Sequence, residues 1–181
     1  MKAIMFFAEG FEEVEALSAV DVLRRGGVEV QMVSITEATK VWGAHDIMVG
    51  MNHIIEDVDI SSVDAVLLPG GMPGTMHLKE SEKVRELLMQ ANDEGKLIGA
   101  ICAAPIVLGA CGLLQGKRAT CYPGFEEELT GATTVVEPVV IDGNIVTSRG
   151  VGTALDFGLK ILEILTDLKN SEKIGTSILH Y

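Results

Sequence analysis

The amino-acid sequence predicts a single three-layer, doubly wound α/β domain with a mostly parallel sheet, spanning residues 1–181. Continuous apolar runs of strand length recur along the chain, and segments with apolar residues at helical spacing separate them. Strands that are apolar throughout are typical of a parallel sheet covered by helices on both faces. A chain of 181 residues, 48% of them hydrophobic, can bury one sizeable core and is shorter than the length at which cores usually divide.

The first part of the chain predicts a strand, a helix and a second strand. Residues 2–8 (KAIMFFA) are a continuous apolar run. The segment after it ends at a glycine pair and predicts a helix whose apolar side holds Val14, Leu17, Val20 and Leu23. Residues 28–35 form a second β-rich run, and residues 39–57 predict short strands or an irregular hairpin.

The middle of the chain repeats this alternation. Residues 64–71 (DAVLLPGG) predict a strand that ends in Pro-Gly-Gly. A helix follows, with Ser81 as its expected cap and Gly95 as its expected stop. Residues 97–102 predict a fourth buried strand, and the next helix has a proline in its first turn.

The last part of the chain predicts a hairpin and a helix. Asp142 and Gly143 lie between two β-rich runs and predict a β-hairpin near residues 137–147. Residues 152–168 predict the last helix, with Leu155, Leu159 and Leu162 on one side. These elements in this order predict a flavodoxin-like domain with one small hairpin, in which ligands bind beyond the carboxyl ends of the strands.

Composition excludes several classes of partner. Fourteen basic and 26 acidic residues give a formal charge of -12, which argues against binding to nucleic acid or to an anionic membrane surface. No apolar stretch approaches the roughly 20 residues that a membrane span needs. Glutamate appears by residue 9, too early for a signal peptide, so we expect a cytoplasmic protein.

The cysteines and histidines predict neither a disulfide framework nor a structural zinc site. Cys102, Cys111 and Cys121 contain no C-x-x-C pair, and the expected compartment is reducing. The four histidines do not stand at metal-ligand spacing from a second ligand. We therefore expect no bound metal.

Cys102 is the first candidate for chemistry because it lies at the junction of a predicted strand and a predicted helix. A helix start offers unpaired N–H groups and a positive dipole end, which favour a thiolate. Small residues around Cys102 permit the sharp turn of a nucleophile elbow, although the usual Gly-x-nucleophile-x-Gly pattern is absent. The alternative is a small buried cysteine, which is how we interpret Cys111 and Cys121.

Two more strand ends should meet Cys102. Glu12, Glu13 and Glu15 follow the first strand, and each could simply lie on the surface of the helix. A carboxyl group packed beside a thiol would instead be protonated. It could then donate a hydrogen bond to the thiolate or transfer protons. The pair formed by Gly70 and Gly71 is either a plain turn or a backbone donor to an oxyanion. We expect Gly71 and Ala103 to be the oxyanion donors.

Four motifs in this order resemble the ThiJ/PfpI superfamily, in the branch of the Parkinson-associated protein deglycase: AEGFEEVEALSAVDVLRRGG, LPGGMPGTMHL, AICAAP and TSRGVGTALDF. The similarity runs from residue 1 to about residue 168. It implies a flavodoxin-like homodimer with Cys102 as the reactive cysteine and Glu15 as its carboxyl partner. It also implies a pocket lined by the loop at Gly70 and Gly71, a supporting Arg149, and an approach by Arg25 of the partner subunit.

Two positions depart from the family pattern. Tyr122 stands where many relatives have a histidine near the cysteine, and His45 stands where the close branch has an arginine. A tyrosine with an ordinary pKa near 10 donates hydrogen bonds but is a poor base at neutral pH. A Cys-His pair formed with this position is therefore not expected.

The resemblance implies a cofactor-independent glyoxalase or protein deglycase that acts on methylglyoxal or its adducts, in the response to oxidative and carbonyl stress. The substrate would be a small aldehyde or a glycated protein. The alternative is a redox sensor or chaperone that responds through oxidation of Cys102. A cysteine hydrolase or amidotransferase is a weaker alternative, because the sequence after Cys102 holds no histidine before His180.

Overall fold

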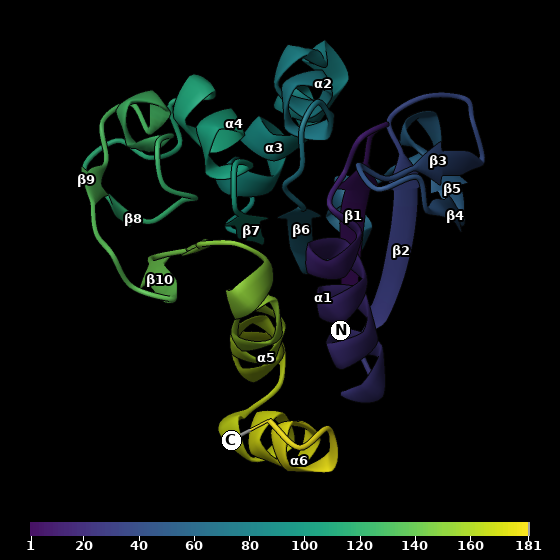
Figure 1. Ribbon diagram of the computed structural model, residues 1–181, viewed down its shortest axis with the longest axis vertical. Helices are drawn as coiled ribbons and strands as arrows, with labels where there is room; N and C mark the ends of the chain where they lie inside the picture. Colours follow the sequence, from purple (N-terminus) through teal and green to yellow (C-terminus); the bar gives the residue numbers. More distant parts are fainter. Residues whose placement is uncertain (181) are drawn as a thin grey trace.

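The computed structural model describes residues 1–180 and has a seven-stranded sheet with helices on both faces (Figure 1). The strand order is β10-β11-β7-β6-β1-β2-β5, and every neighbouring pair is parallel except β10 and β11. The strands are β1 (Lys2–Phe7), β2 (Glu29–Ser34), β5 (His53–Ile54), β6 (Ala65–Leu68), β7 (Leu97–Ile101), β10 (Val139–Asp142) and β11 (Ile145–Ser148). The predicted α/β class and parallel sheet are confirmed.

The helices form the two outer layers, each with its own buried apolar cluster. One layer contains α1 (Glu13–Arg25) and α5 (Ala154–Leu165), with α6 (Leu168–Ser177) packed against α5. The other layer contains α2 (Gly74–Glu80), α3 (Glu82–Asp93) and α4 (Pro105–Ala110). Since the strands are buried on both faces, the core residues of β1 alternate between the two clusters.

Two small strand pairs lie outside the main sheet. The first is a hairpin of β3 (Lys40–Trp42) and β4 (Met48–Gly50), and the second pairs β8 (Arg118–Ala119) with β9 (Thr133–Thr134). Four 3₁₀ turns complete the structure, at Ile55–Asp57, Ile60–Ser62, Glu126–Glu128 and Val151–Thr153. Within residues 1–180, no helix has the length and apolar character to cross a bilayer.

Most predicted elements are present, with two helix faces corrected. Val14 is 50% exposed and Leu155 is 37% exposed, although the spacing placed both on apolar sides. The reason is the close crossing of α1 and α5, because a Cβ on Gly158 would lie only 3.2 Å from the Cα of Ala19. Small residues therefore occupy the centre of this contact, and larger apolar residues nearby stay at its edge.

The structure adds three details to the predicted elements. The helix after β7 ends at Ala110, and Cys111 is its C-cap residue. The short helices α2 and α6 were not predicted, because neither has a long apolar period. The predicted hairpin near residues 137–147 is present as β10 and β11, but it extends the main sheet beyond β7.

Candidate active site

The carboxyl ends of β1, β6 and β7 meet at a cavity of about 610 Å³. This is where the strand order reverses around β1, the usual place for a ligand in an open α/β sheet. The cavity brings together residues from distant parts of the chain, among them Glu12, Glu15, His45, Gly71, Cys102, Tyr122, Arg149 and Gly150. The predicted convergence of the strand ends is therefore present.

Cys102 occupies a sharp turn between β7 and α4. Its φ of 65° is in the left-handed region, where residues other than glycine are uncommon. Hydrogen bonds hold the turn on both sides: the Cys102 N–H donates to the Ser148 carbonyl at 3.0 Å, and the Tyr122 N–H donates to the Cys102 carbonyl at 2.8 Å. The sulfur is next to the N–H groups of Ala103, in this turn, and of Gly71, in the loop after β6.

Glu15 lies in the first turn of α1, and its side chain is fully buried. One carboxyl oxygen, Oε2, accepts a hydrogen bond from the Gly70 N–H at 3.0 Å, and the carboxyl group is also hydrogen-bonded to Cys102. The other oxygen, Oε1, has no hydrogen-bond partner among the described residues. Burial raises the pKa of Glu15 to about 7, so neutral and ionised forms coexist near neutral pH.

The pKa of the Cys102 thiol is raised to about 12, opposite to the expectation from the helix start alone. Burial is the first cause, and the neighbouring Glu15 charge is the second. The N–H groups of Ala103 and Gly71 lower the pKa, as expected, but their effect is smaller. Cys102 therefore carries its proton while Glu15 is ionised.

The two glycines after β6 have different roles. A Cβ on Gly70 would lie 2.5 Å from both the Cys102 Cβ and a Glu15 oxygen, so a side chain there would separate the pair. The Gly70 N–H donates to Glu15 and does not face a substrate. Gly71 has a φ of 92° and presents its N–H to the sulfur, which leaves Gly71 and Ala103 as the candidate oxyanion donors.

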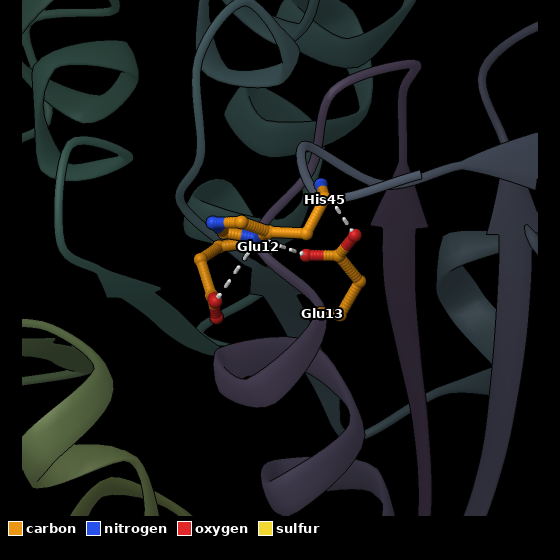
Figure 2. Close-up of side chains that lie close together, drawn as sticks. All are labelled: Glu12, Glu13 and His45. Carbon is orange, nitrogen blue, oxygen red and sulfur yellow. Dashed lines mark hydrogen bonds and ion pairs between the residues drawn. The ribbon is translucent and has the colours of Figure 1, made fainter. Parts of the chain in front are cut away.

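His45 and two glutamates form a second polar group at the edge of the cavity (Figure 2). Glu13 is only 3% exposed and accepts two hydrogen bonds of 2.7 Å from His45, one from the backbone N–H and one from Nδ1. Glu12 caps α1 through the Glu15 N–H at 2.7 Å. Ligand atoms of all three residues lie within 4.8 Å of one another, but these hydrogen bonds already occupy most of them.

Sequence reasoning missed the pairing of His45 with Glu13. The available signal was Gly43 two residues before His45, because a Cβ there would lie 2.1 Å from a Glu13 oxygen. The carboxylate holds the hairpin turn against the start of α1. A backbone hydrogen bond from the Ala44 N–H to the Phe11 carbonyl, 2.8 Å long, supports the same contact.

The remaining candidates differ in their distance from the cavity. Tyr122 is 50% exposed and lines the cavity beside Gly150, and the half-buried Arg149 lines it as well. Arg25 does not line the cavity of its own chain. It is the last residue of α1, about 18 Å from Glu13 by the helical rise, and it forms an ion pair with Asp21. Cys121 is buried, and burial raises its pKa to about 11.

Comparison with known proteins identifies the family to which the chain belongs. The DJ-1/PfpI family matches residues 1–164. Protein DJ-1 homolog B of Arabidopsis thaliana is 41% identical over 96% of this chain, which spans only 40% of that protein's length. The glutathione-independent glyoxalase DJR-1.2 of Caenorhabditis elegans is 38% identical over 90% of this chain and 87% of its own.

Solved structures agree with the fold. The structure of oxidized Toxoplasma gondii DJ-1 superposes with a TM-score of 0.95 at 35% identity, over 99% of this chain and 98% of that one. The range matched by the family, residues 1–164, includes Glu15, the glycine pair, Cys102 and Arg149. The chain belongs to the DJ-1/PfpI family.

Proposed function

We propose that the protein is a cysteine-dependent, cofactor-independent glyoxalase or protein deglycase that acts on methylglyoxal or its adducts. The observation that carries this proposal is the hydrogen bond between the Cys102 thiol and the buried Glu15, in a cavity where two backbone N–H groups face the sulfur. A nucleophile beside a proton-transfer group is what addition to an aldehyde requires. The name of the Caenorhabditis elegans relative, a glutathione-independent glyoxalase, supports the same activity.

Cys102 and Glu15 share one proton between about pH 7 and about pH 12. When that proton is on Glu15, Cys102 is a thiolate that can attack the aldehyde carbon. Glu15 then gives its proton to the aldehyde oxygen, and the product is a thiohemiacetal with Glu15 ionised. The N–H groups of Gly71 and Ala103 stabilise the negative charge that develops on the oxygen.

The thiohemiacetal then rearranges within the cavity. Glu15 removes the hydrogen from the former aldehyde carbon to give an enediolate and returns it to the neighbouring carbon. The proton of the thiohemiacetal hydroxyl moves to the former ketone oxygen, and the product is a lactoyl thioester. Water attacks the thioester while Glu15 accepts a proton from it, and the Cys102 thiolate leaves. The net reaction converts methylglyoxal and water to lactate and a proton. Tyr122 and Arg149 would support the substrate from the opposite wall.

A redox sensor is the second candidate function, favoured by the half-buried Cys102 with its hydrogen-bonded carboxyl partner. Oxidation of the sulfur would place new oxygens beside Glu15, which could stabilise them when protonated. Under a limiting amount of peroxide, Cys102 should gain oxygen before Cys111, read by site-resolved mass spectrometry. Equal oxidation of the two cysteines would remove this candidate.

We also propose that the protein is a homodimer. Large apolar side chains are about half exposed on the β3–β4 hairpin and on the adjacent start of α1, namely Val14, Trp42, Ile47 and Met48. In such a dimer, Arg25 of the partner subunit would approach the cavity, as the family resemblance implies. Sedimentation equilibrium should give a mass near twice the 19.3 kDa of one chain, and a single-chain mass at micromolar concentration would contradict the dimer.

The substitutions Cys102→Ser and Glu15→Ala should each abolish lactate formation from methylglyoxal. The first removes the nucleophile, and the second removes the group that moves the proton, so we expect losses of at least 100-fold. Lactate is measured enzymatically after incubation with equal amounts of folded protein. The control is Cys111→Ser, which changes a cysteine outside the cavity and should keep full activity. Wild-type yield in either active-site variant would contradict the mechanism.

The alkylation rate of Cys102 should rise through about pH 7 and then stay level over several pH units. The rise follows loss of the first proton from the pair, and the level region is where the pair holds one proton. In Glu15→Gln the step near pH 7 should disappear. Cys102 should then titrate once, with a midpoint below 12, because the charge that raises its pKa is gone. A wild-type Cys102 curve identical to that of Cys111 would contradict the shared proton.

A further inference from the structure

The imidazole of His45 is held at the cavity by the buried carboxylate of Glu13. Both oxygens of Glu13 are engaged with His45, and Glu13 is only 3% exposed. The His45 side chain is 68% exposed and lines the same cavity as Cys102. Among the described residues lining this cavity, His45 is the one imidazole.

The Glu13 contact determines which nitrogen of His45 can act on a ligand. Nδ1 lies 2.7 Å from Glu13 Oε2, which fixes the proton of that nitrogen toward the carboxylate. Figure 2 shows the other end of the ring pointing away from Glu13. An imidazole oriented in this way by a buried carboxylate has Nε2 free to give or take a proton, as in nucleophile–base–carboxylate triads.

Only one of the two carboxylate oxygens of Glu15 is free to exchange a proton with a substrate. Its Oε2 is occupied by the Gly70 N–H, and only Oε1 lacks a partner among residues 1–180. Conversion of a thiohemiacetal to a thioester moves two kinds of proton, one on carbon and one on oxygen. The one free carboxylate oxygen of Glu15 can transfer the proton on carbon. The proton on oxygen must then be transferred by another group.

We propose that His45 is a second acid–base residue of the active site, which carries the proton between the two oxygens of the adduct while Glu15 carries the carbon proton. This inference rests on the proposed glyoxalase function. It assigns His45 a catalytic role that depends on Nε2, and it assigns Glu13 the role of a positioning residue.

The proton balance closes over the two steps. As Glu15 removes hydrogen from the carbon bonded to Cys102, His45 Nε2–H donates to the ketone oxygen, and the enediol forms. His45 then accepts the proton of the hydroxyl on the sulfur-bearing carbon, and Glu15 returns its proton to the neighbouring carbon. The product is the lactoyl thioester, with His45 again protonated and Glu15 again ionised.

Charges around His45 favour the protonated starting form. The hydrogen bond and charge of Glu13 raise the pKa of His45 above its ordinary value, and Glu12 and Asp46 act in the same direction. The other ionisable groups that line the same cavity are Glu12, Glu15, Cys102, Tyr122 and Arg149. Since His45 must start protonated, kcat should fall as pH rises through the pKa of His45.

The experiment compares His45→Gln with His180→Gln in lactate formation from methylglyoxal. His180 is a matched control because its Nε2 pairs with Asp156 at 2.9 Å, away from the Cys102 cavity. We expect His45→Gln to lower kcat by about 100-fold, within the range for general acid–base groups, with KM changed less than about threefold. The alkylation rate of Cys102 should stay within about twofold of wild type, and His180→Gln should keep wild-type kcat.

The Glu13→Gln variant tests the orientation and charge of His45. It removes the charge that raises the pKa of His45, so the fall of kcat at high pH should begin at a lower pH than in wild type. If Glu13 had only a structural role, Glu13→Gln would change kcat at every pH, and the pH at which kcat falls would stay the same as in wild type.

The outcomes separate this inference from the function on which it rests. Lactate formation by the wild type, together with a wild-type kcat in His45→Gln, would overturn the role of His45 and leave the glyoxalase proposal standing. Slower alkylation of Cys102 in His45→Gln would overturn it too, because the histidine would then act on the cavity's structure. A wild-type protein that forms no lactate would overturn both.

Discussion

The contact between the Cys102 sulfur and the buried carboxyl of Glu15 constrains the rest of the site. It is made with Cys102 in a left-handed turn, with a φ of 65°, which places the sulfur beside Glu15. It also requires glycine at position 70, where a Cβ would come within 2.5 Å of both partners. This hydrogen bond thus links the start of α1 to the turn after β7, and the Gly70 backbone after β6 makes room for it.

Three glutamates within four residues would normally repel one another, and the structure relieves this repulsion in three ways. Glu12 accepts a hydrogen bond from the Glu15 N–H and so caps α1 at the positive end of the helix dipole. Glu13 pairs with His45. Glu15 is buried, and burial keeps a proton on it up to about pH 7. The helix start thus places one carboxyl with a raised pKa beside the thiol and gives the other two carboxyl groups hydrogen-bond donors.

Sequence patterns were sufficient for the sheet, the main helices and the convergence of the strand ends. Periodicity failed where packing decided the outcome, as at Val14 and Leu155, because the close crossing at Gly158 rotates both helix faces. The raised pKa of Cys102 was also missed. Helix-start effects can be read from the sequence, whereas the degree of burial that outweighs them depends on the folded chain.

The raised pKa of the Cys102 thiol is compatible with the proposed reactivity, because reactivity depends on where the proton shared by Cys102 and Glu15 lies. Above about pH 7 the pair has lost one proton, and the thiolate with neutral Glu15 is one arrangement of the remaining one. That arrangement places a nucleophile and an acid on the same substrate before any bond forms. A cysteine with a low pKa beside an ionised glutamate would have the nucleophile without the acid. A second proton carrier becomes useful once Glu15 has given its proton to the aldehyde oxygen, and this is the step at which His45 is proposed to act.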